Sequence, residues 1–268
     1  MTGIDIARKL QLPEEILEAA YRTEELALPV KPESFEKALE ILEPYAGEDN
    51  GLRLLRFYLD WAVDVKARYD ALGIPETVFW DGMQDIAIWA EDYLEKYGVP
   101  GFREWGWVAA TMTLWVFRLG RLQFQSDVLG EEMTCGGIRY PAGTPVLNVH
   151  IPAGEPLDVK AVEEAMAYAP RFYDIYFSTR FDLFCCHSWL LSPRLRKLLP
   201  TDSRIIRFQD LFEAHEADDE RQAEERVFGF LAEHPADYPE DTSLQRKMKA
   251  ALLAGETFGM GRGLRVIP

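Results

Sequence analysis

Residues 117–125 read FRLGRLQFQ, and the spacing of the apolar residues changes at Gly120 within this stretch. Before that glycine, apolar side chains recur at the three- and four-residue spacing of an amphipathic helix. After it, Leu122 and Phe124 alternate with polar residues, which is typical of a strand with one buried face. The change predicts a domain boundary, with a helical domain over residues 1–120 and an α/β domain over residues 121–268.

The helical half consists of segments that begin at proline and end at glycine. Pro13 opens the first segment and Pro32 the second, and longer amphipathic helices are expected over residues 51–73 and 75–98. A fifth helix is expected over residues 103–119. It is apolar on nearly all sides, so we expect it to lie between the helical half and the following domain. Packing is favoured over a ligand cage for its aromatic residues, which are Trp105, Trp107, Trp115 and Phe117.

The second half alternates predicted strands and helices. Strands are expected over residues 121–125, 135–140, 146–151, 183–191 and 205–212, the first three of them forming a meander. Helices are expected over residues 157–177, 193–199 and 242–254, the first of them kinked or divided by Pro170. The acidic stretch 215–226 is interpreted as a solvated loop and helix face, and glycines 259, 261 and 263 as part of a C-terminal tail.

Composition and charge exclude several classes of function. The chain has 268 residues, 48% of them hydrophobic, which is enough for a core without disulfides. With 29 Lys and Arg against 45 Asp and Glu, the net charge of −16 disfavours nucleic acids and anionic membrane surfaces as partners. No apolar run is long enough for a transmembrane helix or a signal peptide. The three cysteines form no CxxC pair, so a cytoplasmic protein is expected.

Polar and apolar residues alternate along four of the predicted strands, which predicts that one face of the sheet is polar. The polar positions are Arg121, Gln123, Asn148, His150, Arg207 and Gln209. In the strand 183–191, either Cys185 and His187 or the opposite set can join that face. A polar sheet face can simply meet water, and a histidine in a strand can be structural. Asn148, His150 and His187, however, lie within hydrophobic strings, where an unpaired polar group is costly, and they are our candidate functional residues.

Other kinds of chemistry are less well supported. Cys185–Ser188 suggests a nucleophile activated by a histidine, but adjacent strand residues point to opposite faces, so buried structural cysteines are favoured. The four histidines lack metal-ligand spacing, and neither a phosphate-binding P-loop nor a dinucleotide-binding loop is present, so no metal site is predicted. Residues 150–158 run from a strand through a glycine-containing loop to a helix N-terminus, which is a potential anion site. Glu155 and Asp158 oppose that interpretation, since they would cap the helix and repel a phosphate.

Several longer segments of the sequence resemble a family of bacterial two-domain proteins, which have a helical N-acyltransferase N-terminal domain and a GNAT-like C-terminal domain. The segments on which the resemblance rests are GIPETVFWD (73–81), FRLGRLQFQ (117–125), LNVHIPAGEPLD (147–158), SWLLSPRLRKLLP (188–200), RIIRFQDLF (204–212) and TSLQRKMKAALLAGETFGMGRG (242–263). The resemblance implies an α+β fold in which acyl-CoA lies where two central strands diverge.

The resemblance also assigns roles to individual residues. The strand 146–151 would pair with pantetheine and the loop 153–157 would hold the pyrophosphate, so the implied acyl-CoA contacts are Val149, Ile151, Ala153 and Gly154. Our catalytic candidates are His150 as the base, with Asn148 and His187 in support. The sequence departs from the family pattern in lacking a Q/R-x-x-G-x-G/A loop and a tyrosine in the segment 193–199.

Two functional hypotheses follow. The first is an acyl-CoA-dependent N-acyltransferase that transfers the acyl group directly to a small acceptor. The alternative is a non-catalytic GNAT-like module that binds a small polar ligand or a protein partner. No cofactor other than acyl-CoA, here a substrate, is expected.

Overall fold

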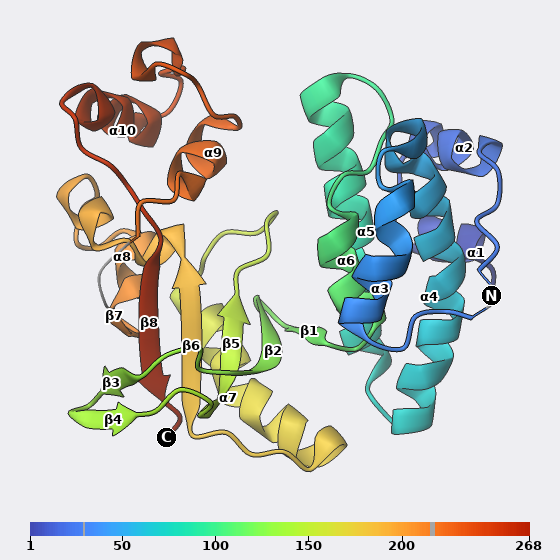
Figure 1. Cartoon of the computed structure of the whole chain (residues 1–268), viewed down its shortest axis with the longest axis horizontal. Helices are drawn as coiled ribbons and strands as arrows, with labels where there is room; N and C mark the ends of the chain where they lie inside the picture. Colours follow the sequence, from blue (N-terminus) through green and yellow to red (C-terminus); the bar gives the residue numbers. More distant parts are fainter. Residues whose placement is uncertain (29, 215–217) are drawn as a thin grey trace. The chain divides into compact units, whose positions relative to one another are not determined.

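The computed structural model describes residues 1–28, 30–214 and 218–268. The chain forms two compact units (Figure 1). The first contains Met1–Gln123, Pro152–Glu155 and Ile175–Phe177, and the second contains Phe124–Ile151, Pro156–Asp174 and Ser178–Pro268. The predicted boundary after residue 120 stays a prediction.

The described residues of the first unit form the α-helices α1 (Gly3–Lys9), α2 (Glu14–Arg22), α3 (Phe35–Leu42), α4 (Leu52–Leu72), α5 (Glu76–Tyr97) and α6 (Trp105–Met112), with 3-10 turns η1 (Glu43–Tyr45) and η2 (Glu48–Gly51). Sequence reasoning missed α1, which begins at a reciprocal capping box between Thr2 and Asp5. Helix α4 ends at Gly73 (φ 70°), a left-handed position that glycine adopts without strain. Buried aromatic side chains of α4, among them Tyr58, Trp61 and Tyr69, fill the core of this unit.

The expected helix over residues 103–119 is wrong in its second half. Helix α6 ends at Met112, the backbone turns through Leu114 (φ 62°), and β1 (Val116–Leu119) follows. The Thr113 hydroxyl donates to the Ala109 carbonyl at 2.8 Å, and such local bonds at threonine favour a helix end. The apolar composition alone could not separate a buried helix from a helix followed by a buried strand. In the first unit, the Trp115 ring stacks on Phe35, with 4.1 Å between the ring centres.

A mixed β-sheet forms the centre of the second unit (Figure 1). Its strands lie in the order β2-β5-β6-β8-β7, and β2 has its first two residues in the first unit. Their bounds are β2 (Leu122–Val128), β5 (Pro145–His150), β6 (Leu183–Ser188), β7 (Glu213–Ala214) and β8 (Gly261–Val266). β5 and β6 are parallel, and β8 is antiparallel to β6 and β7. A helical N-terminal region followed by a mixed sheet confirms the predicted fold class.

Helix α7 (Val159–Phe177) covers one face of this sheet (Figure 1). Its Tyr173 hydroxyl donates to the Phe124 carbonyl in β2 at 2.9 Å. Asp158 caps the helix by accepting from the Ala161 N–H, as the sequence indicated. Pro170 lies inside α7, which continues as one element through it rather than dividing.

Two of the predicted strands are wrong. Residues 135–140 form two short strands, β3 (Met133–Cys135) and β4 (Ile138–Tyr140), joined by Gly136 and Gly137 with φ of 59° and 77°. Among the described residues they pair with each other alone, in a separate two-stranded sheet, so the expected three-strand meander does not form. The pair of adjacent glycines was the signal for this tight turn.

Residues 205–212 form helix α8 (Arg204–Gln209) instead of the expected strand. Ser203 caps this helix by accepting from the Ile206 N–H, a local bond that strand alternation cannot reveal. Arg207 and Gln209 therefore do not lie on the sheet. Gln209 is buried and donates to the carbonyls of Leu190 and Ser192.

The remaining elements lie between β6 and the C-terminal strand β8 along the chain. After β6 come two 3-10 turns, η3 (Trp189–Leu191) and η4 (Pro193–Lys197), so the strand expected over 183–191 is shorter than predicted. The chain then forms α9 (Gln222–Phe228), η5 (Pro235–Asp237) and α10 (Ser243–Leu253) before β8. Residues 215–217 of the acidic stretch lie outside the described residues.

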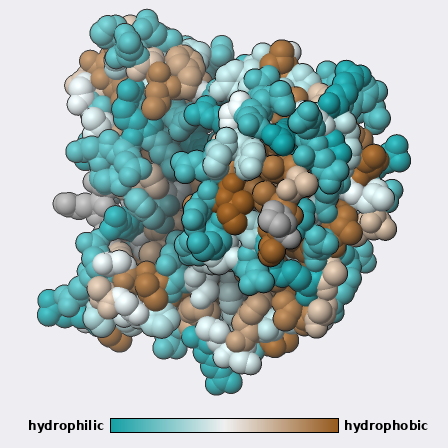
Figure 2. Space-filling view, turned by 45° about the vertical axis from the view of Figure 1, so that its right-hand side comes forward, coloured by the Kyte–Doolittle hydropathy of each residue, from teal (hydrophilic) through white to brown (hydrophobic). Residues whose placement is uncertain are grey.

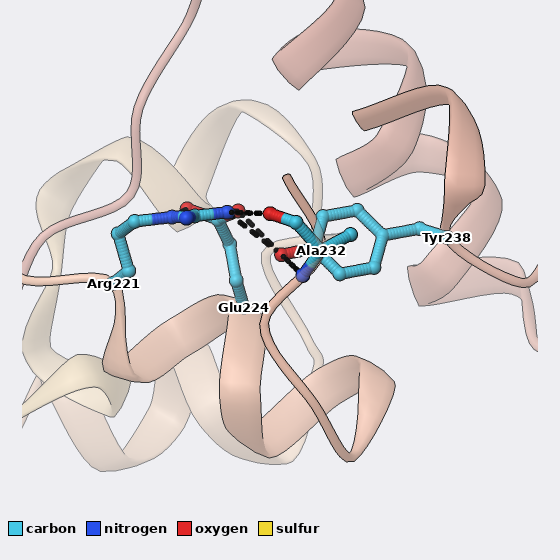
Figure 3. Close-up of polar contacts among 4 residues, drawn as sticks. All are labelled: Arg221, Glu224, Ala232 and Tyr238. Carbon is cyan, nitrogen blue, oxygen red and sulfur yellow. Dashed lines mark hydrogen bonds and ion pairs between the residues drawn. The ribbon is translucent and has the colours of Figure 1, made fainter. Parts of the chain in front are cut away.

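A polar cluster of the exposed Arg221 with the buried Glu224, Ala232 and Tyr238 lies in the lobe that contains α9 and α10 (Figure 3). Arg221 donates to the Glu224 carboxylate at 2.7 and 3.0 Å, and the Tyr238 hydroxyl donates to the same carboxylate at 2.8 Å. That hydroxyl also accepts from the Ala232 N–H at 3.1 Å. Glu224 is buried, but these bonds keep its pKa below the usual range against the opposing effect of burial.

The glycine-rich tail is part of the fold. It leads into β8, which pairs with β6 along the whole of that strand. A Cβ at Gly259 would lie 1.4 Å from the carbonyl oxygen of Asp218, and one at Gly261 would lie 2.2 Å from that of Leu191. These two glycines are required because another backbone passes directly against them.

Candidate functional site

A hydrogen-bonded polar network connects β2 and β5. His150 Nε2 lies 2.9 Å from Gln125 Oε1, and Gln125 Nε2 donates to Asp127 Oδ2 at 3.1 Å. Asn148 Nδ2 donates to the same carboxylate oxygen at 3.2 Å. Because side chains two residues apart on a strand share a face, these four polar groups lie together on one side of the sheet.

The network fixes the orientation of the His150 ring. Asp127 can only accept when ionised, so it orients the NH2 group of Gln125 toward itself and the Oε1 atom toward His150. An amide oxygen can only accept, and His150 therefore carries its proton on Nε2. Nδ1 then holds the lone pair that can take up a proton.

Burial makes His150 neutral. Loss of solvation lowers the pKa of His150 to about 4, although the nearby Asp127 carboxylate acts in the opposite direction. At neutral pH the imidazole is unprotonated, which is the state that a general base needs. A pKa this low also means that His150 holds a proton only weakly.

The register of β5 and β6 decides which side of β6 joins the polar face. Asn148 is the Cα partner of Cys185, so Cys185 and His187 lie on the side of Asn148 and His150. Burial raises the pKa of the Cys185 thiol to about 11, and that of Cys186 is raised as well. Neither thiol is activated as a nucleophile, as adjacent strand positions indicated.

His187 has a different partner from His150. Its Nε2 lies 3.1 Å from Asp218 Oδ2. Asp218 also accepts from the Met260 N–H, and its own N–H donates to the Met260 carbonyl. These bonds hold the two ends of the segment that contains α9 and α10. The structure thus brings His150 and Asn148 into one network, while His187 belongs to a second.

Sequence reasoning missed Gln125, Asp127 and Asp218 as partners of the three candidates. Gln125 and Asp127 continue the alternation of β2 beyond Phe124, so the i, i+2 spacing was a signal that could have found them. Asp218 lies 31 residues from His187, and no local pattern connects the two.

Among the described residues, only the middle of β5 is paired with β6. Their paired register joins Leu147 to Phe184 and Asn148 to Cys185 and ends there, although both strands are described in full. β6 continues to pair with β8 as far as Ser188. Within the described residues, the edge of β6 that faces β5 is therefore unpaired with β5 beyond Cys185. An extended ligand with amide groups could bind to such strand edges through main-chain hydrogen bonds.

The two parts of the expected acyl-CoA site fall in different units. Val149 and Ile151 belong to the second unit, where their two-residue spacing directs both N–H groups to the same edge of the chain. Ala153 and Gly154 belong to the first, in the exposed loop Pro152–Glu155. Gly154 has φ 95°, which glycine adopts freely. Within the described chain, no acceptor is hydrogen-bonded to the N–H of Ala153, Gly154 or Glu155.

Arginines approach this loop within the first unit. The buried Arg118 lies 3.6 Å from the Glu155 carboxylate and 4.0 Å from Asp85. Arg121, expected on a strand, instead lies in the turn before β2 and donates to the carbonyls of Pro152 and Glu155. The negative charge of Glu155, which opposed an anion site, is therefore paired with a guanidinium.

The described residues contain neither a candidate metal centre nor a helix that could span a membrane. Within residues 1–28, 30–214 and 218–268, no group of three His, Cys, Asp or Glu side chains could hold a metal ion. None of the helices in these ranges is sufficiently long and apolar to span a bilayer. The face drawn in Figure 2 is predominantly hydrophilic, with smaller hydrophobic patches.

Known proteins resemble the chain over its whole length. A crystal structure of an acyltransferase in complex with decanoyl-CoA and teicoplanin has a TM-score of 0.77 at 24% identity, covering 99% of this chain and 88% of that one. An acyltransferase mutant in complex with octanoyl-CoA has the same TM-score at 23% identity, with the same coverage. An acyltransferase in complex with decanoyl-CoA has a TM-score of 0.70 at 21% identity and covers both chains fully. Among curated proteins none matches.

Family models account for both halves of the sequence. Residues 1–114 match the N-acyltransferase N-terminal domain, and residues 116–265 match the GNAT-like C-terminal domain. The second match covers more than half of the chain. The chain therefore belongs to the family of proteins with a GNAT-like C-terminal domain, here preceded by an N-acyltransferase N-terminal domain.

Proposed function

We propose that this protein is an acyl-CoA-dependent N-acyltransferase that acts on a small acceptor with an amino group. The observation that carries the proposal is that the pairing of β5 with β6 ends at Asn148 and Cys185, while β6 remains paired with β8 as far as Ser188. It leaves strand edges that can bind the amide groups of a pantetheine arm. Membership of the family and the acyl-CoA ligands of the similar acyltransferases support the same conclusion.

The chemistry is direct transfer of the acyl group. The acceptor ammonium loses a proton, its nitrogen attacks the thioester carbonyl, the C–S bond breaks, and the CoA thiolate leaves and is protonated. His150 is the proposed base, through the Nδ1 lone pair that the bond to Gln125 defines. Asn148 supports it through Asp127, and the N–H groups of Val149 and Ile151 are the proposed donors to the thioester oxygen.

His187 is proposed as a supporting residue of the same sheet face, and Ala153 and Gly154 as contacts of the CoA phosphates. The N–H groups of the loop support this role because none of them donates to an acceptor in the part of the chain that the structure describes. We also retain the boundary after residue 120, and we infer a cytoplasmic location from the cysteines Cys135, Cys185 and Cys186, all of which are free.

The proposal is tested by thiol release from decanoyl-CoA in the presence of a panel of small primary amines. Amine-dependent release of CoA is expected, and His150→Ala should abolish it while His187→Ala retains it. Unchanged activity in His150→Ala would show that this residue is not the base. If native mass spectrometry instead finds an unrelated metabolite or a second protein on the purified chain, the non-catalytic binding module is supported.

A further inference from the structure

The buried side chain of Arg121 has no part in the chemistry above, yet it is bound to the loop Pro152–Glu155. Its Nη1 donates to the Pro152 carbonyl at 3.0 Å, and its Nη2 donates to the Glu155 carbonyl at 2.7 Å. Arg121 is only 6% exposed, so the guanidinium has given up most of its hydration for these contacts. One side chain therefore connects both ends of the loop, in which Pro152 is buried and residues 153–155 are exposed.

The bond to the Pro152 carbonyl determines the direction of the first N–H of the loop. In a trans peptide the C=O and the following N–H point in opposite directions, so a Pro152 carbonyl turned toward Arg121 directs the Ala153 N–H away from it. Gly154 follows with its positive φ, and among the described residues the N–H groups of Ala153, Gly154 and Glu155 have no acceptor. Consecutive outward N–H groups form a concavity that suits an anion.

The charges around the loop favour this arrangement. Arg121 places a positive charge beneath the loop, and Arg118 pairs with the Glu155 carboxylate at 3.6 Å. Burial lowers the pKa of Arg121, and so does the positive charge of Arg118, whereas Glu155 raises it. Asp81 and Asp85 also face Arg118, and burial raises the pKa of each of these two carboxyls. The Arg121 guanidinium donates to two loop carbonyls, so it acts by fixing the conformation of the loop backbone.

We propose that Arg121 is a positioning residue for the diphosphate of acyl-CoA, because it holds the loop with its N–H groups directed outward. The inference rests on the proposed function, since that function supplies the ligand. It also explains how the loop works without the usual glycine-rich motif: two carbonyl contacts from a buried arginine hold the backbone in one conformation, whereas additional glycines would only permit that conformation.

Calorimetric titration with decanoyl-CoA and with decanoyl-pantetheine, which lacks the phosphates, tests this role without knowledge of the acceptor. Arg121→Gln should weaken decanoyl-CoA binding by at least about tenfold, as expected for the loss of a charge-assisted contact, and leave decanoyl-pantetheine binding unchanged. Arg121→Lys keeps the charge but lacks the planar fork that reaches two carbonyls, so it should not restore affinity. Arg139→Gln removes one exposed positive charge from β4 as a matched control and should bind both ligands normally.

The results of these titrations distinguish a failure of the Arg121 role from a failure of the proposed function. If the wild-type protein binds neither ligand, the proposed function is wrong and the inference falls with it. If the wild-type protein binds decanoyl-CoA and Arg121→Gln binds it equally well, only the role of Arg121 is wrong. An equal loss for both ligands, or full affinity in Arg121→Lys, also overturns that role. Should Arg121→Gln not fold, Arg121→Lys replaces it in the test, and the same selective loss of decanoyl-CoA binding is expected.

Discussion

Protonation of His150 should destabilise the folded protein as the pH falls. The imidazole has an ordinary pKa of 6.5 in the unfolded chain, and burial lowers its pKa to about 4 in the folded protein. The unfolded state therefore binds more protons between these values, so stability is retained above pH 6.5 and lost as the pH falls toward 4. At pH 4.5 the linkage relation gives a loss of about 2.6 kcal/mol relative to pH 8, an upper bound because the side chain is only half-buried.

A comparison with His150→Gln isolates this contribution, since all carboxylates titrate in both proteins. Urea unfolding at pH 8 and pH 4.5 should show that the wild-type protein loses up to about 2.6 kcal/mol more stability than the variant. NMR titration of the imidazole gives the pKa directly. A measured pKa near 6.5, or an equal pH dependence in both proteins, would refute the account of the buried network.

Three further perturbations test neighbouring parts of the structure. Asp127→Asn removes the carboxylate that raises the pKa of His150, so the NMR-detected pKa should fall further, and a rise would contradict the network. Tyr238→Phe leaves a buried carboxylate with one donor fewer and should cost about 1–3 kcal/mol in urea unfolding, whereas no loss would argue against the cluster. Gly259→Ala places a methyl group against a carbonyl oxygen and should lower the thermal midpoint, while Gly130→Ala, with open space around it, should not; equal midpoints would contradict the close approach.

Long periodic elements could be predicted from the sequence, and short ones could not. The helices over 51–73 and 75–98 are bounded by glycine and proline and carry several turns of periodic side chains, so local signals and tertiary packing agree. In the segments 103–119 and 205–212, a few apolar residues fit either period, and the outcome depended on Leu114 and on the Ser203 cap.

In the candidate site, residues with a local sequence signal could be predicted, and residues whose contacts depend on tertiary structure could not. Asn148 and His150 were found because a polar side chain within an apolar strand needs a partner, and the structure supplies Asp127 and Gln125. Arg121 was placed on the sheet face because its spacing fits the alternation of β2. Its contacts with a loop 31 and 34 residues away depend on tertiary structure and leave no local pattern.

Binding of an acyl-CoA thioester tests the central claim most directly. In titration calorimetry with decanoyl-CoA, we predict saturable binding of one equivalent, together with a higher thermal midpoint, because ligand at one hundred times its Kd stabilises a protein by about 2.7 kcal/mol. The absence of both heat and thermal stabilisation at millimolar decanoyl-CoA would contradict the account of this protein as an acyl-CoA-dependent N-acyltransferase.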